Sequence, residues 1–281
     1  MPTELPDALL RSLDLLRCPH CGGALRAEER RLRCEAGHSF DVARQGYVAL
    51  LTGRPATSGD DDAAVRARER FLATGVYTPL REAVADLATA DAPADAAVLD
   101  VGCGTGYHLA GVLDRLPGAR GLGLDSSTRA LRATVRAHPR AAAASWDVFR
   151  PLPVADGSVD VVLDVFAPRH PEEFRRVLRP DGRLVVARPT DRHLAELRAQ
   201  LPGTVSVDPA KEDRLRESLE PLLEPVDTRR VEHGIALDRA SARDWVTMTP
   251  SGRHVDPAAL DDVPLPGRVT VSVLATAYRP R

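Results

Sequence analysis

Short apolar runs separated by helix-like stretches dominate the chain from residue 97 onward. The runs "AVLDV" at 97–101, "GLGLD" at 121–125 and "VDVVLDV" at 159–165 have the length and apolar character of buried parallel strands. The segments between them, such as "YHLAGVL" and "TRALRATVRA", are suited to helices, and Ser126 or Ser127 can cap the second. Alternating strands and helices predict an α/β fold with a parallel sheet.

The C-terminal part of the chain extends this pattern. The segment 175–189, "RRVLRPDGRLVVARP", predicts a helix, a turn at Pro180–Gly182 and a further strand. The run 268–280, "RVTVSVLATAYRP", alternates as a final strand does, which would complete a seven-stranded sheet.

Composition narrows the class of protein. The chain has 281 residues, a formal net charge of −2 and 38 basic residues, of which only Lys211 is lysine. Bulk charge therefore does not indicate nucleic-acid binding, and any RNA contact must come from a local basic face. No apolar run reaches the length of a membrane span and no signal pattern opens the chain, so we expect a cytoplasmic protein without membrane contact.

Three of the four cysteines lie close together near the N-terminus. Cys18, Cys21, Cys34 and His38 form the pattern C-x2-C-x12-C-x3-H. Zinc takes four such ligands in a tetrahedron, so this spacing predicts a closed structural Zn²⁺ site rather than a redox pair or a disulfide framework. We expect a hairpin that turns near Gly22–Gly23 to bring the two halves together, and His20 to lie outside the ligand set.

The charge of this segment leaves its role open. Between Arg17 and Arg54, seven arginines stand against four acids, a difference of +3 that three thiolates and one Zn²⁺ reduce to +2. Such a basic module could present arginines to phosphates, or it could be a solvated hairpin surface.

A glycine-rich loop follows the strand at 97–101. Asp100, Gly102, Gly104 and Gly106 give the order D-x-G-x-G-x-G, and a helix is expected next. The glycines permit a tight turn and close approach of a ligand to the backbone. Tyr107 stands where the dinucleotide fingerprint needs Gly or Ala, and the chain has no phosphate-binding GxxxxGK[ST] motif. The loop resembles the first motif of Rossmann-like S-adenosylmethionine-dependent methyltransferases.

Two acids follow the next strands in the positions that such a cofactor needs. Asp125 ends its strand about twenty residues past the glycines, which suits a ribose diol. Asp147 follows "AAAASW", where this fold usually has an acid near the adenine amino group. Cys103, inside the loop, is expected to be a small packed residue rather than a nucleophile.

The cysteine pattern, "FDVARQGYVALL" at 40–51, "ARERFLATGVYTPLR" at 67–81 and the cofactor loop together resemble the 23S rRNA (guanine-N1)-methyltransferases. "VFAPR", "RHLAEL" and "VTMTP" fit the same family along nearly the whole chain, closest to its actinobacterial macrolide-resistance branch. The resemblance implies a class I methyltransferase fold, with methyl transfer to N1 of a guanine in a 23S rRNA hairpin loop near the peptide exit tunnel. It also implies that the zinc module reads RNA, and it makes a homodimer plausible.

The resemblance carries further residues to the cofactor site. Tyr77, Gly104, Thr105 and His193 match positions that contact S-adenosylmethionine in the family. From the residues alone, Tyr77 could equally be a core aromatic, and His193 could lie on the surface in the first turn of a helix. The chain departs from the family at Ala49, where asparagine is common, and at Thr105, where some members have an acid.

The acceptor side of the site is expected at the end of the strand 159–165. Asp164 is our candidate for the base that removes the N1 proton, although it could instead orient the base or the cofactor. Because N1 lies on the pairing edge, the guanine must be unpaired or flipped out, and Phe166 and Pro168 could stack against it, with Trp146 and Trp245 as alternatives. Arg169, Arg175 and Arg176 could contact phosphates, or the last two could lie on a solvated helix face.

The expected organisation has three parts. Residues 1–45 form the zinc module with a leading helix at Leu5–Leu16, residues 46–70 a linker, and residues 71–281 the methyltransferase domain. The acidic run Asp60–Asp62 could repel phosphate or cap a helix that starts near Ala63. A small-molecule methyltransferase with a structural zinc module is the alternative function, and a noncatalytic RNA-binding protein is a third.

Overall fold

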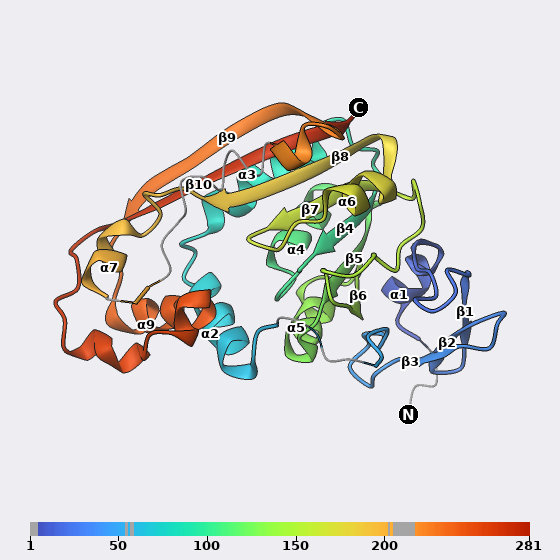
Figure 1. Ribbon diagram of the computed structural model, residues 1–281, viewed down its shortest axis with the longest axis horizontal. Coiled ribbons are helices and arrows are strands. Elements are labelled where there is room, and N and C mark those ends of the chain that lie inside the picture. Colours follow the sequence, from blue (N-terminus) through green and yellow to red (C-terminus); the bar gives the residue numbers. More distant parts are fainter. Residues whose placement is uncertain (1–4, 54–55, 57–58, 202, 205–216) are drawn as a thin grey trace.

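The computed structural model describes residues 5–53, 56, 59–201, 203–204 and 217–281. Its centre is a seven-stranded sheet in the order β6-β5-β4-β7-β8-β10-β9 (Figure 1). The strands are β4 (Ala97–Val101), β5 (Arg120–Asp125), β6 (Ala141–Ser145), β7 (Val159–Val165), β8 (Leu178–Pro189), β9 (Leu223–Ile235) and β10 (Val269–Pro280). The first five are parallel, and β10 is antiparallel to both β8 and β9. The predicted α/β fold and final strand are thus confirmed.

Helices cover both faces of the sheet. They are α3 (Thr78–Thr89), α4 (Tyr107–Arg115) and α5 (Thr128–Ala137) on one side, and α1 (Asp7–Arg11), the 3₁₀ turn η1 (Leu13–Leu15) and α6 (Pro171–Val177) on the other. In β4, Val98 packs with α3 and α4 while its neighbour Leu99 packs into the opposite cluster. Because both faces are buried, the strand needs a continuous apolar run rather than an alternating one.

The order of the strands predicts a ligand crevice at a defined edge of the sheet. The chain passes from β4 to β5 on one side and later returns to β7 on the other side of β4. Such a reversal separates the loops that follow the two neighbouring strands, and ligands bind there, beyond the carboxyl ends of the strands. The glycine loop follows β4 at this point.

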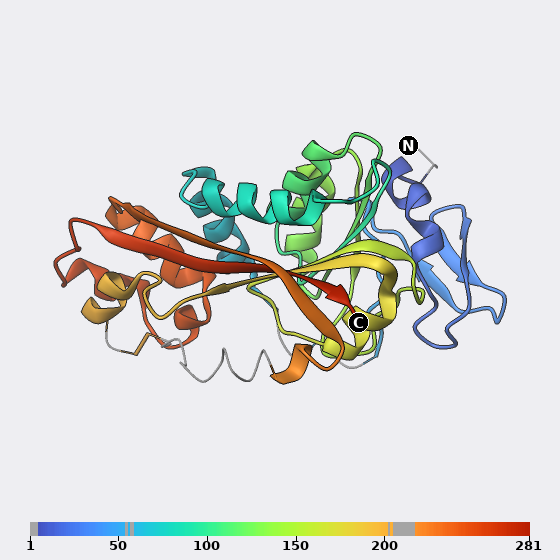
Figure 2. The same cartoon turned by 90° about the horizontal axis from the view of Figure 1, so that it is seen from above.

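The N-terminal module lies at one end of the molecule. It contains an antiparallel three-stranded sheet of β1 (Leu25–Glu28), β2 (Arg31–Cys34) and β3 (Ser39–Asp41). The opposite end carries α7 (Ala195–Gln200) and α9 (Arg239–Met248), with η2 (Pro250–Arg253) and η3 (Pro257–Asp261), as two perpendicular views show (Figures 1 and 2). Helix α2 (Asp62–Ala73) packs on α9 and reaches α5.

Several local expectations need correction. The leading helix is not continuous over Leu5–Leu16, because α1 ends at Arg11 and a 3₁₀ turn follows Ser12. The expected turn at Pro180–Gly182 is an irregularity within β8, where the register against β7 shifts between Val159 and Val161.

Two caps are confirmed: Asp61 accepts a hydrogen bond from Ala64 N at the start of α2, and Ser127 accepts one from Ala130 N at the start of α5.

The segment expected to be a linker has structure of its own. Val48 forms a parallel bridge to Ala144 of β6, and Ser145 N donates to Val48 O. Tyr47, Val48 and Leu50 are buried, and α2 already begins at Asp62. The domain limits 1–45, 46–70 and 71–281 remain predictions, but the described parts of 46–70 pack on the sheet and form a helix.

Candidate functional site: a cysteine–histidine cluster and a cofactor crevice

The four residues of the cysteine pattern meet at one point. Their ligand atoms all lie within 4.8 Å of one another. The Cys21 and Cys34 sulfur atoms are 3.7 Å apart, and His38 Nδ1 lies 3.5 Å from Cys18 Sγ and 3.4 Å from Cys34 Sγ. Tetrahedral zinc with Zn–S bonds of 2.3 Å requires sulfur atoms about 3.8 Å apart, so three thiolates and one imidazole fit Zn²⁺.

Two similar turns present these ligands. Gly22 N donates to Cys18 O and Gly37 N donates to Cys34 O, and both glycines have positive φ, +71° and +86°. Glycine adopts this backbone region without the strain that a side chain would add. The hairpin turn expected at Gly22–Gly23 instead lies at Glu29 and Arg30 between β1 and β2, since Gly22 belongs to the first ligand turn.

His20 lies beside the cluster, and the ligand set described here does not include it. Its ring stacks on Phe40 and its Nε2 lies 3.3 Å from Thr52 Oγ1. It therefore connects the cluster to the following chain, in agreement with its expected place outside the ligand set.

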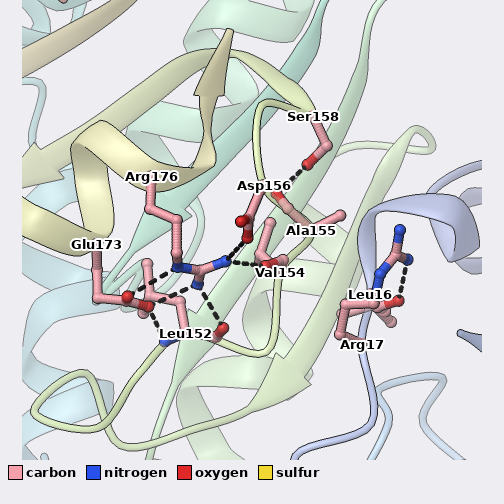
Figure 3. A network of polar contacts seen from close by, with 9 residues as sticks. All are labelled: Leu16, Arg17, Leu152, Val154, Ala155, Asp156, Ser158, Glu173 and Arg176. Atoms are coloured by element: carbon pink, nitrogen blue, oxygen red, sulfur yellow. Dashed lines mark hydrogen bonds and ion pairs between the residues drawn. The ribbon is translucent and has the colours of Figure 1, made fainter. Parts of the chain in front are cut away.

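The module is docked on the large sheet by backbone bonds. Leu16 bridges Val154, Arg17 N donates to Pro153 O, and Ala155 N donates to Leu15 O. The docking segment 151–156 is held in turn by Arg176 of α6 (Figure 3). The connection rests on main-chain pairing, so the module has a fixed orientation relative to the sheet.

Arg176 has a structural role rather than the expected phosphate contact or solvated position. Its guanidinium binds the Glu173 carboxylate, Asp156, and the carbonyl oxygens of Leu152 and Val154 (Figure 3). Arg169 is also engaged, since its Nε lies 3.9 Å from Asp164 Oδ2 and its side chain is mostly buried.

The glycine loop turns sharply under the crevice. Gly102, Gly104 and Gly106 have φ values of +74°, +53° and +75°. A Cβ at Gly106 would lie 2.9 Å from Thr134 Cα, and one at Gly102 would lie 2.7 Å from the Ala167 Cβ. The first and third glycines are thus required by packing as well as by backbone conformation. Cys103 is buried against Thr134, and burial raises the pKa of its thiol well above the ordinary value, as expected of a packed residue.

Asp125 is tied to this loop. Its Oδ2 accepts from Gly104 N at 2.9 Å, and its Oδ1 accepts from Ser127 N at 2.8 Å. Burial raises the pKa of this carboxyl, although these two backbone donors oppose the shift. The donors fix the carboxylate at the edge of the crevice while each oxygen keeps acceptor capacity for a further donor, such as a ribose hydroxyl.

Three acids gather at the carboxyl ends of adjacent strands. Asp100 is buried near the end of β4. Burial, together with the negative charges of Asp125 and Asp164, raises the pKa of Asp100 to about 8. Asp164 has no exposed surface, and Arg169 lies against it. Repulsion among the three acids in a desolvated site keeps a proton on Asp100 near neutral pH. A cation placed beside Asp100 would favour the ionised form of its carboxyl group.

An aromatic cluster lies next to the acids. Tyr77 Oη is 2.9 Å from His193 Nε2, and both side chains are buried. Ser272 N donates to His193 Nδ1 at 3.2 Å, so the neutral ring carries its proton on Nε2. Burial lowers the pKa of His193 to about 3 and raises that of Tyr77 above its usual range. His193 is therefore not the surface residue considered as an alternative, whereas Tyr77 is a core aromatic that also makes a specific polar contact.

Sequence reasoning did not find the residues that orient this pair. Ser272 lies on β10, and its backbone N donates to His193 Nδ1. Trp245 lies on α9, and its side chain opposes the rise that burial causes in the pKa of Tyr77. No sequence motif marks Ser272. Its role depends on the pairing of β10 with β8, which brings Ser272 N to His193. Trp245 and Trp146 are buried, so neither is the stacking platform considered from the sequence.

The remaining predicted residues have different surroundings. Thr105 is buried in the loop. Asp147 is also buried and accepts from Phe149 N. Phe166 is 42% exposed, has a φ of +58° and lies with its ring 5.9 Å from that of Tyr77. An aromatic side chain held in this strained region beside a polar pair is typical of a functional position.

The whole arrangement can bind a nucleoside with a cationic substituent. The glycine backbone and Asp125 suit a ribose, the acids suit a positive centre, and Phe166 offers an exposed ring.

Among the described residues, no helix has both the length and the apolar character needed to cross a membrane.

Family models match two segments of the chain. A zinc-ribbon model described as RlmA, N-terminal, matches residues 16–55, and a methyltransferase-domain model matches residues 98–182. The first range contains the cysteine–histidine cluster, and the second contains the glycine loop, Asp125, Asp147 and Asp164.

Relatives extend the match over nearly the entire chain. The 23S rRNA (guanine(748)-N(1))-methyltransferase of Streptomyces fradiae is 47% identical over 271 residues, which cover 94% of this chain and 96% of the relative. A Micromonospora griseorubida protein, provisionally named a 23S rRNA (guanine-N(1)-)-methyltransferase, is 47% identical over 287 residues, 94% of this chain and 97% of the relative.

Solved structures show a likeness at low identity. A TehB-like SAM-dependent methyltransferase from Corynebacterium glutamicum is 19% identical, covers 77% of this chain and 96% of its own, and has a TM-score of 0.46. The close relatives, the two family models and the order of the sheet identify this chain as an S-adenosylmethionine-dependent methyltransferase with an N-terminal zinc ribbon, a member of the 23S rRNA (guanine-N1)-methyltransferase family.

Proposed function

We propose that this protein transfers a methyl group from S-adenosylmethionine to N1 of a guanine in 23S rRNA. The observation that carries the proposal is the 94% coverage at 47% identity, which includes the zinc ribbon as well as the methyltransferase domain. A small-molecule enzyme would have no evident use for a basic zinc module docked by main-chain bonds beside the catalytic domain.

The target position follows from the relative's name. The Streptomyces fradiae protein is named for guanine 748 of 23S rRNA, and we propose the corresponding hairpin-loop guanine near the exit tunnel as the target here. A methyl on N1 removes a pairing-edge donor and adds bulk, and this change is the physical basis for the expected macrolide resistance.

Bound S-adenosylmethionine supplies an electrophilic methyl group whose C–S bond breaks as the new N–C bond forms. Asp125 would hold the ribose, the backbone at Gly102, Gly104, Thr105 and Gly106 would form the floor of the site, and Asp147 would bind near the adenine. Tyr77 and His193 would lie at the reacting end, and Asp100 would supply negative charge near the sulfonium. These side chains would hold the methyl group in line with N1 of the guanine.

Asp164 remains our candidate for the proton acceptor. It lies at the end of β7, one residue from Val165 and two from the exposed Phe166. Because Arg169 covers it, the carboxylate would have to be uncovered when the guanine enters. Phe166 would then stack on the flipped base, as aromatic residues do in other single-base pockets.

The setting of the reaction is also part of the proposal. An enzyme that modifies 23S rRNA works in the cytoplasm, and we place this protein there. We further propose a homodimer, in which two zinc modules would contact one extended RNA.

Primer extension on 23S rRNA tests the proposal. Unmodified rRNA incubated with the protein and S-adenosylmethionine should give one strong stop next to the target guanine, because N1-methylguanine cannot pair. Asp125→Ala should abolish the stop, whereas Glu172→Gln, an exposed change on α6, should keep it. Cofactor binding without any stop, on naked rRNA and on ribosomes, would favour the small-molecule alternative.

A further inference from the structure

One arginine lies directly over the glycine loop. Arg68 belongs to α2, and a Cβ at Gly104 would lie 3.2 Å from its Nη1. Its Nη2 donates to Met248 O, at the end of α9, at 2.8 Å. The side chain is 27% exposed, so the guanidinium is partly desolvated and still accessible from the crevice.

Two neighbouring ion pairs fix the helix that carries Arg68. Glu69 binds Arg129 of α5, and Arg70 binds Asp244 of α9. These residues flank Arg68 in the chain and connect α2 to the helices on either side. The guanidinium is therefore held above Gly104 by the fold and does not depend on a flexible surface segment.

The charge of Arg68 reaches both sides of the cofactor crevice. Burial raises the pKa of Tyr77 and of Asp125, and the positive charge of Arg68 opposes that rise at both groups. Arg68 consequently lies near the residue proposed to hold the ribose and near the one proposed at the reacting end.

In the present structure Arg68 binds Asp60. The Asp60 carboxylate contacts Arg68 Nη1, and its negative charge also raises the pKa of Asp125. The preceding residue, Gly59, lies so close to the loop after Asp125 that an added Cβ would meet Ser126 Oγ at 2.6 Å. Residues 59–60 thus cross the crevice between the ribose side and the glycine loop.

The chemistry of the cofactor determines what can replace Asp60. S-adenosylmethionine carries a positive sulfonium, a positive ammonium and one anionic group, the carboxylate of its methionine end. A guanidinium in a partly desolvated crevice is costly beside the cations and favourable beside the carboxylate, which it can bind through two parallel hydrogen bonds.

We propose that Arg68 is the residue that binds the cofactor carboxylate, and that Asp60 occupies the same guanidinium in the free protein. This inference rests on the proposed function only in taking the cofactor to lie on the glycine loop. Binding of the cofactor exchanges one carboxylate for another at Arg68 and moves residues 59–60 away from Ser126.

A pair of ligands that differ in the carboxylate tests the first half. S-adenosylhomocysteine carries the carboxylate, and 5′-methylthioadenosine lacks the whole amino-acid end beyond the sulfur. By calorimetric titration, Arg68→Gln should weaken S-adenosylhomocysteine binding about 10- to 100-fold, the range for a lost charge-assisted hydrogen bond. Its affinity for 5′-methylthioadenosine should not change, which also shows that the crevice remains folded.

Arg66→Gln is the matched control, because Arg66 lies on the same helix, is half-exposed and pairs with Asp62. It should change neither affinity. Equal loss of both ligands in Arg68→Gln, or the same loss in Arg66→Gln, would overturn the assignment. If Arg68→Gln does not fold, Arg68→Lys should keep the charge and lose only part of the discrimination between the two ligands.

Asp60→Asn tests the second half. Removing the competing carboxylate should tighten S-adenosylhomocysteine binding and leave 5′-methylthioadenosine binding unchanged. An unchanged or weaker affinity for S-adenosylhomocysteine would contradict the exchange at Arg68. If the wild-type protein bound neither ligand, the proposed function would fail together with this inference. If the wild-type protein and Arg68→Gln bound S-adenosylhomocysteine equally well, only the inference would be contradicted.

Discussion

Tyr77 and His193 are 116 residues apart in the chain, and their side chains meet through a 2.9 Å contact between Oη and Nε2. Because Ser272 N donates to His193 Nδ1, the Nε2 proton points to the Tyr77 oxygen. With this donor directed at its oxygen, Tyr77 keeps its own hydroxyl hydrogen for another acceptor, and the crevice is where that acceptor would bind.

Replacement of Tyr77 by phenylalanine should therefore have two effects. It leaves the buried Nε2–H of His193 without its acceptor, which should reduce the free energy of unfolding by about 1–3 kcal/mol. It should also weaken S-adenosylhomocysteine binding. Urea denaturation and calorimetric titration measure the two effects, with Tyr47→Phe as a control that removes a hydroxyl from another buried tyrosine. An unchanged ligand affinity would show that Tyr77 only supports the fold.

The raised pKa of Asp100 predicts how stability changes with pH. The folded protein keeps this proton up to a pKa of about 8, whereas the unfolded chain releases it near the ordinary value of 3.8. The folded state binds more protons within this window, so the free energy of unfolding should decrease as pH rises from about 4 to about 8.

Asp100→Asn should remove that decrease. The variant should gain stability relative to the wild type as pH rises toward 8, and the difference should shrink toward pH 4. Urea denaturation of the cofactor-free proteins at several pH values measures it. Parallel curves for the two proteins would mean that Asp100 titrates normally.

The cysteine–histidine cluster predicts one tightly bound zinc per chain. Cys34→Ser should release the metal and destabilise the N-terminal module, because a structural zinc contributes its binding free energy to folding. Metal analysis by mass spectrometry and thermal unfolding provide the readouts. Cys103→Ser, at the fourth cysteine, is the control and should keep the zinc. A folded wild-type protein without metal would contradict the prediction.

The role of Asp164 can be separated from cofactor binding. Asp164→Asn keeps the size of the side chain but removes its basicity, so it should bind S-adenosylhomocysteine normally and transfer methyl groups slowly. The rate of single-turnover transfer to 23S rRNA should also rise less with pH than that of the wild type. A normal rate would limit Asp164 to positioning, together with its neighbour Arg169.

Local signals in the sequence predicted the framework of the fold well. The buried strands, the caps at Asp61 and Ser127, the zinc spacing and the position of Asp125 all depend on neighbouring residues or fixed intervals. The pair Gly22–Gly23 suggests a hairpin turn from the sequence alone, but the positive φ of Gly22 belongs to the turn that presents the metal ligands.

Features that depend on distant contacts were not accessible in this way. Arg176 looked like a surface arginine, and only the docked segment 151–156 supplies the carbonyl groups that it binds. Tyr77 and His193 were assigned from the resemblance, and their contact requires α3, β8 and β10 to be assembled. Nothing in the order of residues indicates that Asp60 and Arg68 meet above Gly104.

The backbone pairing at Leu16–Val154 and Val48–Ala144 has a consequence for choosing a substrate. Two separate main-chain connections prevent the zinc ribbon from swinging, so the separation between it and the methyl-transfer crevice is a constant of the molecule. If the ribbon binds part of the RNA, as the resemblance implies, this fixed separation would select substrates by length. We then expect an RNA whose reactive guanine lies at another distance from the part bound by the ribbon to be a poor substrate, whatever its base sequence.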